Sequence, residues 1–341
     1  MKMQESASVP QFSRKDLIPG GEVKWCPGCG DYAILASIQK IIPELGIPRE
    51  NFVFVSGIGC SSRFPYYMNT YGLHSIHGRA PAIASGVKLA NPKLSVWVMT
   101  GDGDAMSIGG NHLIHALRRN LDLKIVMFNN EIYGLTKGQY SPTTQIGQVT
   151  KSSPHGVPDY PFTPLRLALG AGATFVAREF DVDGPHLQAV LKEAAMHKGA
   201  AFIEIWQNCV VFNDSVFDPI VSKESRADHV AYLEEGQPIL FGKENEKAIV
   251  SDGTSLKIVP ASEASKEDIL VHRSDLEDPS YAFLVAGMTY PEFPVPMGIF
   301  RNVPRPAYEE ILEGQIEKAK AKAKDTSIKA LFDGLETWTI N

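Results

Sequence analysis

Acidic and amide side chains follow two neighbouring apolar runs in the middle of the chain. Asp102 lies between two glycines directly after the run 94–99, and Asn130 follows the run 123–128. Mg²⁺ takes oxygen ligands, usually a few from the protein and the rest from phosphate groups and water. A Gly-Asp-Gly turn alone is common in loops, but a second strand end carrying an amide indicates a site for Mg²⁺ and, through it, a diphosphate.

Thiols are the second group of residues with clear chemistry. Cys26 and Cys29 are close enough in sequence to reach one metal centre, whereas Cys60 and Cys209 each follow an apolar run. Four thiolates suit a [4Fe–4S] cluster or a structural zinc. Two other interpretations stay open from the residues alone: Cys60 and Cys209 as buried apolar side chains, and Cys26 with Cys29 as a thioredoxin-type redox pair.

A parallel sheet would bring these groups together. Strands are expected at 52–55, 94–99, 123–128, 174–177 and 201–206, and helices at 31–42, 80–89, 105–119, 165–171 and 186–197. Strands that alternate with helices at this spacing are typical of βαβ units. Because ligands bind beyond the carboxyl ends of such strands, we expect one edge of the sheet to carry the site. We also expect Asp31 to cap the first helix, and helix 105–119 to point its positive end at the anion.

The outer parts of the chain show weaker patterns. Residues 1–20 are expected to form an arm, and 138–164 a long surface loop. The charged helix expected at 308–324 would face solvent with its Glu and Lys residues. The predicted fold class is therefore α/β: a doubly wound, mostly parallel sheet in a domain at 21–220, with a C-terminal extension at 221–341.

Composition narrows the function classes. Lys and Arg number 33 against 39 Asp and Glu, which gives a formal net charge of −6 without a basic block, so nucleic-acid binding is not expected. No apolar run approaches the roughly 20 residues of a membrane span, and the first 20 residues lack an apolar signal core. We therefore expect a cytoplasmic protein, in which thiols stay reduced and serve as ligands or catalysts.

The segments described above resemble a known family. Gly101-Asp102-Gly103 followed by Asn130 is similar to the thiamine-diphosphate motif, and the continuation 133–143 resembles the β subunit of 2-oxoacid:ferredoxin oxidoreductases, most of all the 2-oxoglutarate type. The segments 26–30, 57–62 and 208–213 match cluster-bearing positions of the same subunits. The resemblance covers about residues 20–215 and implies a fold of the thiamine-diphosphate-binding (pyrophosphate-binding) type.

The resemblance implies a role for individual residues. Asp102, Asn130 and the main-chain carbonyl of Ile132 would bind Mg²⁺. A [4Fe–4S] cluster would be bound by Cys26, Cys29, Cys60 and Cys209. Contacts with thiamine diphosphate would come from Ile58, Gly59, Cys60, Ser61, His77, Gly101, Gly103, Asp104, Gly134, Leu135 and Thr136. His77 is also expected at the substrate, with Arg79 or Lys137 receiving the second carboxylate of 2-oxoglutarate.

The implied activity converts 2-oxoglutarate, coenzyme A and oxidised ferredoxin reversibly into succinyl-CoA, CO₂ and reduced ferredoxin. Thiamine enzymes need a glutamate beside the aminopyrimidine ring, and the α subunit (or a fused α/γ chain) is expected to supply it. The chain alone should therefore be inactive. Two alternatives remain from the sequence: the same enzyme class acting on pyruvate or a branched 2-oxoacid, and a non-catalytic iron–sulfur or zinc protein.

Overall fold

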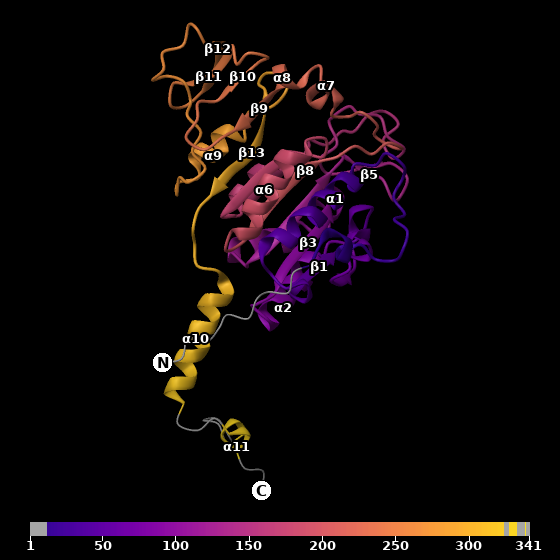
Figure 1. The fold of residues 1–341 in the computed structure, drawn as a ribbon, viewed down its shortest axis with the longest axis vertical. Helices are drawn as coiled ribbons and strands as arrows, with labels where there is room; N and C mark the ends of the chain where they lie inside the picture. Colours follow the sequence, from indigo (N-terminus) through magenta and orange to yellow (C-terminus); the bar gives the residue numbers. More distant parts are fainter. Residues whose placement is uncertain (1–11, 324–326, 333–337, 339–341) are drawn as a thin grey trace.

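Eight strands form the central sheet of the computed structural model, which describes residues 12–323, 327–332 and 338 (Figure 1). The strands lie in the order β2-β1-β3-β4-β8-β7-β13-β9. Their bounds are β1 Phe52–Ser56, β2 Tyr71–His74, β3 Ser95–Gly101, β4 Leu123–Asn129, β7 Phe175–Phe180, β8 Ala201–Trp206, β9 Val230–Leu233 and β13 Val295–Asn302. All neighbouring pairs are parallel except β13 with β7. The predicted mostly parallel sheet is confirmed.

Helices cover both faces of this sheet. One face packs against α1 (Asp31–Ile41) and α6 (Gly184–Met196), and the other against α2 (Ala80–Ala90), α4 (Gly110–Arg119), α5 (Pro164–Gly170) and α9 (Ser280–Val285). Alternate residues of β1 face the two layers of helices. Phe52 and Phe54 pack on the side of α1 and α6, and Val53 and Val55 pack on the side of α2 and α4. Strands buried on both faces read as continuous apolar runs, which is why the sequence predicts them well.

Two local expectations are wrong. The helix expected at 105–119 is broken into α3 (Asp102–Met106) and α4, because the chain between them passes close to other backbone: a Cβ at Gly109 would lie 2.3 Å from the carbonyl oxygen of Asp104. The N-cap of α1 is Gly30, not Asp31. The Asp31 carboxylate is fully buried and has no hydrogen-bond partner among the described residues.

The chain after residue 221 contributes β9 and β13 to the central sheet. It also forms a small antiparallel sheet of β10 (Leu240–Phe241), β11 (Lys247–Ser251) and β12 (Leu256–Pro260). Helix α10 (Tyr308–Lys322) leads away from the sheet toward α11 (Ile328–Phe332), as Figure 1 shows. The remaining short elements are η1 Arg14–Leu17, η2 Ile42–Leu45, η3 Arg49–Asn51, η4 Ser61–Tyr67, β5 Ile132–Tyr133, β6 Gln139–Tyr140, α7 Asp218–Val221 and α8 Arg226–His229.

The arm expected at 1–20 lies outside the described residues up to position 11, and its remainder includes η1. In the described part of the chain, no helix has the length and apolar character needed to cross a membrane.

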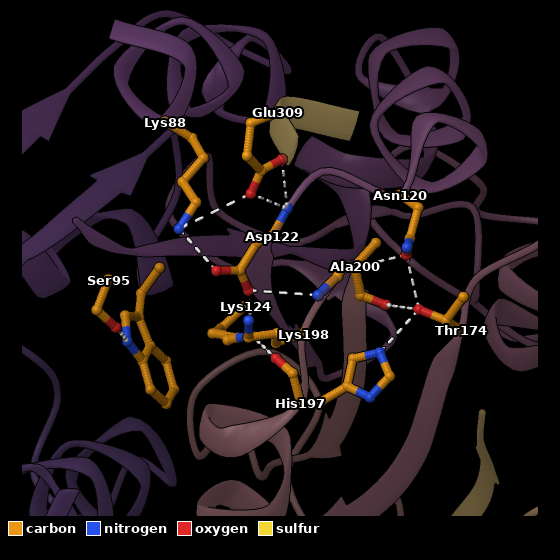
Figure 2. Close-up of polar contacts among 12 residues, drawn as sticks. Lys88, Ser95, Asn120, Asp122, Lys124, Thr174, His197, Lys198, Ala200 and Glu309 are labelled. Carbon is orange, nitrogen blue, oxygen red and sulfur yellow. Dashed lines mark hydrogen bonds and ion pairs between the residues drawn. The ribbon is translucent and has the colours of Figure 1, made fainter. Parts of the chain in front are cut away.

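A buried polar network joins α10 to the amino ends of the strands (Figure 2). Asp122, directly before β4, receives Nζ of Lys88 and Nζ of Lys124 at 2.6 Å each. Its backbone N–H donates to the Glu309 carboxylate (3.3 Å), and this carboxylate also lies 3.9 Å from Nζ of Lys88. The Glu and Lys residues of the helix expected at 308–324 were expected to face solvent. This expectation is wrong for Glu309, which is only 4% exposed.

Candidate functional site

The order of the strands reverses between β1 and β3, so their carboxyl ends form a topological switch point. The chain leaves β1 for β2 on one side, whereas β3 leads to β4 on the other. Ligands of doubly wound sheets bind at such a switch point. A cavity of about 50 Å³, here called the strand-end cavity, lies there. It is lined by every residue expected to contact thiamine diphosphate or Mg²⁺: Ile58, Gly59, Cys60, Ser61, His77, Gly101, Asp102, Gly103, Asp104, Asn130, Ile132, Gly134, Leu135 and Thr136.

Asp102 is buried at the floor of this cavity and is held by two hydroxyl groups. Its Oδ2 accepts hydrogen bonds from Ser141 Oγ at 2.5 Å and from Thr143 Oγ1 at 2.7 Å. Burial raises the pKa of Asp102 to about 6, and the two hydroxyls oppose that rise. Ser141 and Thr143 are each 2% exposed, so the segment expected as a surface loop is buried where it begins. Main-chain N–H groups at Asp102 and Gly103 also donate to this carboxylate and oppose the rise, and a carboxylate keeps further lone pairs for a cation.

Asn130 and Ile132 lie beside Asp102 at the end of β4. The side-chain oxygen of Asn130 accepts the Ile132 N–H at 3.2 Å, and its main-chain carbonyl accepts Nδ2 of Asn213 at 2.8 Å. Both residues are buried. One carboxylate oxygen, one amide oxygen and one carbonyl at the same cavity are the kinds of ligand that suit Mg²⁺, so the residues present fit the expected ion.

Asp104 connects the loops that form the cavity wall. Its carboxylate accepts the N–H groups of Ile58 (3.1 Å) and Gly78 (2.8 Å) and the hydroxyl of Thr100 (2.8 Å). Nδ1 of His77 lies 2.7 Å from the same carboxylate. These contacts occupy both oxygens and fix the loop after β1 against the loop before α2.

One feature of the wall suits a phosphate group. Ser61 is 4% exposed, and its Oγ has no hydrogen-bond partner among the described residues although it faces the cavity. A buried hydroxyl without a partner is unusual, and a bound acceptor would satisfy it. Gly103 serves a neighbour: a Cβ there would lie 2.1 Å from the ring of Tyr133, whose hydroxyl donates to the Gly103 carbonyl at 3.0 Å. The contact with Tyr133 explains why position 103 has no side chain, and the expected contact of Gly103 with thiamine diphosphate stays a prediction.

The four cysteines line a second cavity of about 230 Å³, here called the thiol cavity. Gly134 lies close to two of these thiols. A Cβ at this position would be 3.3 Å from Sγ of Cys209 and 3.7 Å from Sγ of Cys60, so there is little room for a side chain. Burial, and next the Asp31 carboxylate, raises the pKa of Cys29 and that of Cys60, the latter to about 12. These thiols are therefore protonated until a metal displaces the protons.

The described residues contain no group of three or more His, Cys, Asp or Glu side chains already arranged as a metal site. The chemistry of the donor set, four thiols around one cavity, nevertheless fits a [4Fe–4S] cluster and also fits zinc.

The residues expected to contact substrate lie in different places. His77 lines the strand-end cavity and is 39% exposed. Lys137 lines the thiol cavity instead. Arg79 lines neither cavity, and its Nη1 donates to the carbonyls of His77 (3.4 Å) and Ile108 (3.3 Å). The structure therefore does not bring Arg79 and Lys137 together with His77 at one cavity.

The two cavities share one wall. Its residues are Cys60, Asn130, Gly134, Leu135 and Gln207. Gln207 was missed from the sequence, as were Ser141 and Thr143 as partners of Asp102. Gln207 directly follows the strand 201–206, so the same strand-end rule that selected Asp102 and Asn130 would have found it.

Comparisons with known proteins agree with the geometry. Residues 57–205 match the family described as thiamine pyrophosphate enzyme, C-terminal TPP binding domain. A 2-oxoglutarate oxidoreductase subunit KorB from Mycobacterium tuberculosis is 50% identical, over 99% of this chain and 92% of that protein. A 2-oxoacid:ferredoxin oxidoreductase subunit beta from Aeropyrum pernix is also 50% identical, over 56% of this chain and 60% of its own length. Among solved structures, a 2-oxoglutarate:ferredoxin oxidoreductase from Magnetococcus marinus with 2-oxoglutarate, coenzyme A and succinyl-CoA bound is 31% identical, with a TM-score of 0.76 over 96% of this chain and 98% of that one.

Proposed function

The chain belongs to the family of 2-oxoacid:ferredoxin oxidoreductase β subunits of the 2-oxoglutarate type, and from this membership we propose how its residues serve the reaction. The enzyme oxidises 2-oxoglutarate with coenzyme A and passes the electrons to ferredoxin. The observation that carries this proposal is the common wall of the strand-end and thiol cavities, because it brings a diphosphate-type site next to four thiols.

The strand-end cavity is proposed to hold the diphosphate end of thiamine diphosphate. The Asp102 carboxylate, the side-chain oxygen of Asn130 and the Ile132 carbonyl would bind Mg²⁺, and Ser61 Oγ would donate to a phosphate oxygen. When bound, thiamine diphosphate supplies an electron sink for a carbanion at an acyl carbon. Asp104 and His77 hold the loops around it in position.

The thiol cavity is proposed to hold a [4Fe–4S] cluster on Cys26, Cys29, Cys60 and Cys209. A cluster at this position would take electrons one at a time from the adjoining site. Lys24, Arg63 and Lys137 also line the cavity, and no carboxylate from the described part of the chain does. In a chain with a formal net charge of −6, this local excess of cations suits an acidic electron carrier such as ferredoxin.

A partner α subunit is proposed to complete the site. A cavity of about 50 Å³ is much smaller than the several hundred Å³ that a whole cofactor needs. Leu135 lines this cavity and is 46% exposed. Ile76, next to His77 in the sequence, is 68% exposed, and Ile108, whose backbone lies close to Gly78, is 56% exposed, so apolar surface is available for a partner. Glu131, the buried acid nearest to Asn130, lines a different cavity, so we infer that the glutamate for the aminopyrimidine ring comes from the partner.

We further infer that residues 21–220 carry the cofactor ligands and that 221–341 contribute contacts with the partner. The reduced state that the four thiols need favours the cytoplasm.

Anaerobic purification of the complex tests these proposals. About four iron, one Mg²⁺ and one thiamine diphosphate per β chain are expected, with viologen reduction that requires 2-oxoglutarate, coenzyme A and the α subunit. Strong activity of the isolated chain would refute the proposed role of the partner. Zinc in place of iron would refute the cluster.

Substrate choice needs its own measurement. We propose that Lys137 or Arg79 receives the second carboxylate of 2-oxoglutarate and that His77 contacts the substrate or the diphosphate. Lys137→Ala is then expected to raise KM for 2-oxoglutarate without a matching rise for pyruvate. An equal change for both acids would remove that role, and faster turnover of pyruvate or a branched 2-oxoacid by the unmodified complex would favour the alternative substrates.

A further inference from the structure

Gln207 has an unusual environment for a residue to which no role is assigned. It directly follows β8, and its backbone N–H donates to the carbonyl of Asn129 at 2.9 Å, which extends the pairing of β8 with β4 by one residue. The side chain is 2% exposed, and its Oε1 is buried without a hydrogen-bond partner among the described residues. Native proteins rarely leave a buried amide oxygen unpaired, so this atom requires an explanation.

The position of Gln207 suggests one. Of the five residues that line both cavities, Cys60 is an expected cluster ligand and Asn130 an expected Mg²⁺ ligand, whereas Gly134 and Leu135 carry no polar side chain. Among the described residues of the shared wall, Gln207 is therefore the one polar side chain that is not an expected ligand.

Gln207 is also held tightly. A Cβ at Gly30 would lie 2.9 Å from the Gln207 Cβ, so the chain next to Cys29 packs directly against it. This contact and the backbone hydrogen bond fix the position of the Gln207 backbone and Cβ.

An amide group can serve two neighbours at once, because its NH₂ donates and its oxygen accepts. A cluster offers sulfur acceptors, and Mg²⁺-bound water or the cofactor amino group offers donors. We propose that the side-chain amide of Gln207 bridges the two cavities, donating to a sulfur of the cluster and accepting from the thiamine–Mg²⁺ side. This proposal rests on the proposed function. Hydrogen bonds to cluster sulfurs are among the factors that set the reduction potential, so the amide would tune the electron acceptor as well as position the donor site.

The test compares Gln207→Met with the unmodified complex. Methionine has a similar length and no amide, so it removes both hydrogen bonds with little change in volume. Gln188→Met on α6 is the matched control, because Gln188 lines neither cavity. Iron and thiamine diphosphate contents are measured first. The cluster midpoint potential is then measured by an EPR-monitored redox titration, and the Kd for thiamine diphosphate with Mg²⁺ by calorimetry.

Gln207→Met is expected to shift the reduction equilibrium about tenfold toward the oxidised cluster, which is about 59 mV for a one-electron couple. It is also expected to raise the Kd for thiamine diphosphate about tenfold, while Gln188→Met changes neither. A change in only one quantity, or in neither, would overturn the bridge. If Gln207→Met loses its cluster, Gln207→Leu is measured in its place with the same expectations. A wild-type complex without iron or thiamine diphosphate would overturn the proposed function and the bridge together.

Discussion

Removal of the two hydroxyls on Asp102 tests whether this carboxylate is a positioned Mg²⁺ ligand. Ser141→Ala and Thr143→Val each remove one donor from Oδ2. A hydrogen bond to a charged group contributes about 1.5–3 kcal/mol. At about 1.4 kcal/mol per factor of ten, each variant should weaken Mg²⁺-dependent binding of thiamine diphosphate about 10- to 100-fold. Outer-shell substitutions around metal ligands have effects of the same size.

The double variant should lose less than the product of the two single losses. The two hydroxyls lie 3.2 Å apart and donate to the same oxygen, so the loss of one changes the environment of the other. Titration of thiamine diphosphate into the complex at fixed Mg²⁺ measures the Kd. Ser152→Ala is the control on the same segment. The Ser152 hydroxyl accepts the Tyr140 N–H (3.2 Å) and is not one of the donors to Asp102. A double variant that binds as tightly as Ser152→Ala would refute the reasoning.

The same variants should shift the pH dependence in a defined direction. Mg²⁺ needs the ionised carboxylate, and burial already raises the pKa of Asp102 to about 6. Binding should therefore weaken as pH falls through about 6 in the unmodified complex. Loss of the hydroxyls removes stabilisation of the charged form, so the pKa of Asp102 rises further and binding weakens at higher pH. An unchanged pH profile would contradict this account.

Three other predictions concern the thiols and the amino-end network. Replacement of any one cysteine by serine should lower the iron content well below four per chain; full iron retention would remove that residue from the ligand set, which is Cys26, Cys29, Cys60 and Cys209. Burial lowers the pKa of His197 to about 4, so unfolding free energy should fall by up to about 3 kcal/mol as pH drops from about 6.5 toward 4. Urea titrations should show a smaller loss in His197→Gln, and equal losses would disprove the effect. Glu309→Ala should lower stability by about 1–3 kcal/mol, whereas the neighbouring surface residue Glu310 should tolerate alanine within about 1 kcal/mol; equal effects would show that burial of Glu309 is unimportant.

The strands that carry the site could be predicted from the sequence because they are buried on both faces. β8 has the expected bounds, β1 and β4 end one residue beyond the expected runs, and β3 begins one residue later and ends two residues later than expected. β2 was missed because it is an exposed edge strand, in which no run of apolar residues is required. The break between α3 and α4 was missed because it depends on how closely the backbone at Gly109 approaches Asp104 and Gly78. Gly78 is far from Gly109 in the sequence, so no local pattern reports this contact.

Some residues of the site could be located from the sequence, and others only from the folded structure. Asp102, Asn130 and the cysteines stand at strand ends or in short motifs, so spacing and resemblance located them. Ser141 and Thr143 reach Asp102 only through the path of a loop that contains little regular structure. Gln207 also stands at a strand end, but it carries no charge, and its proposed role depends on the wall that the two cavities share.

The network in Figure 2 lies at the opposite end of the strands from the proposed cofactor sites. Asp122 directly precedes β4, whereas Asp102, Asn130 and Gln207 follow β3, β4 and β8. The length of the sheet therefore separates the residues that anchor α10 from those that are proposed to hold cofactors. Substitutions that adapt the fold to a new temperature can accumulate at the amino ends while the redox chemistry at the carboxyl ends is left untouched.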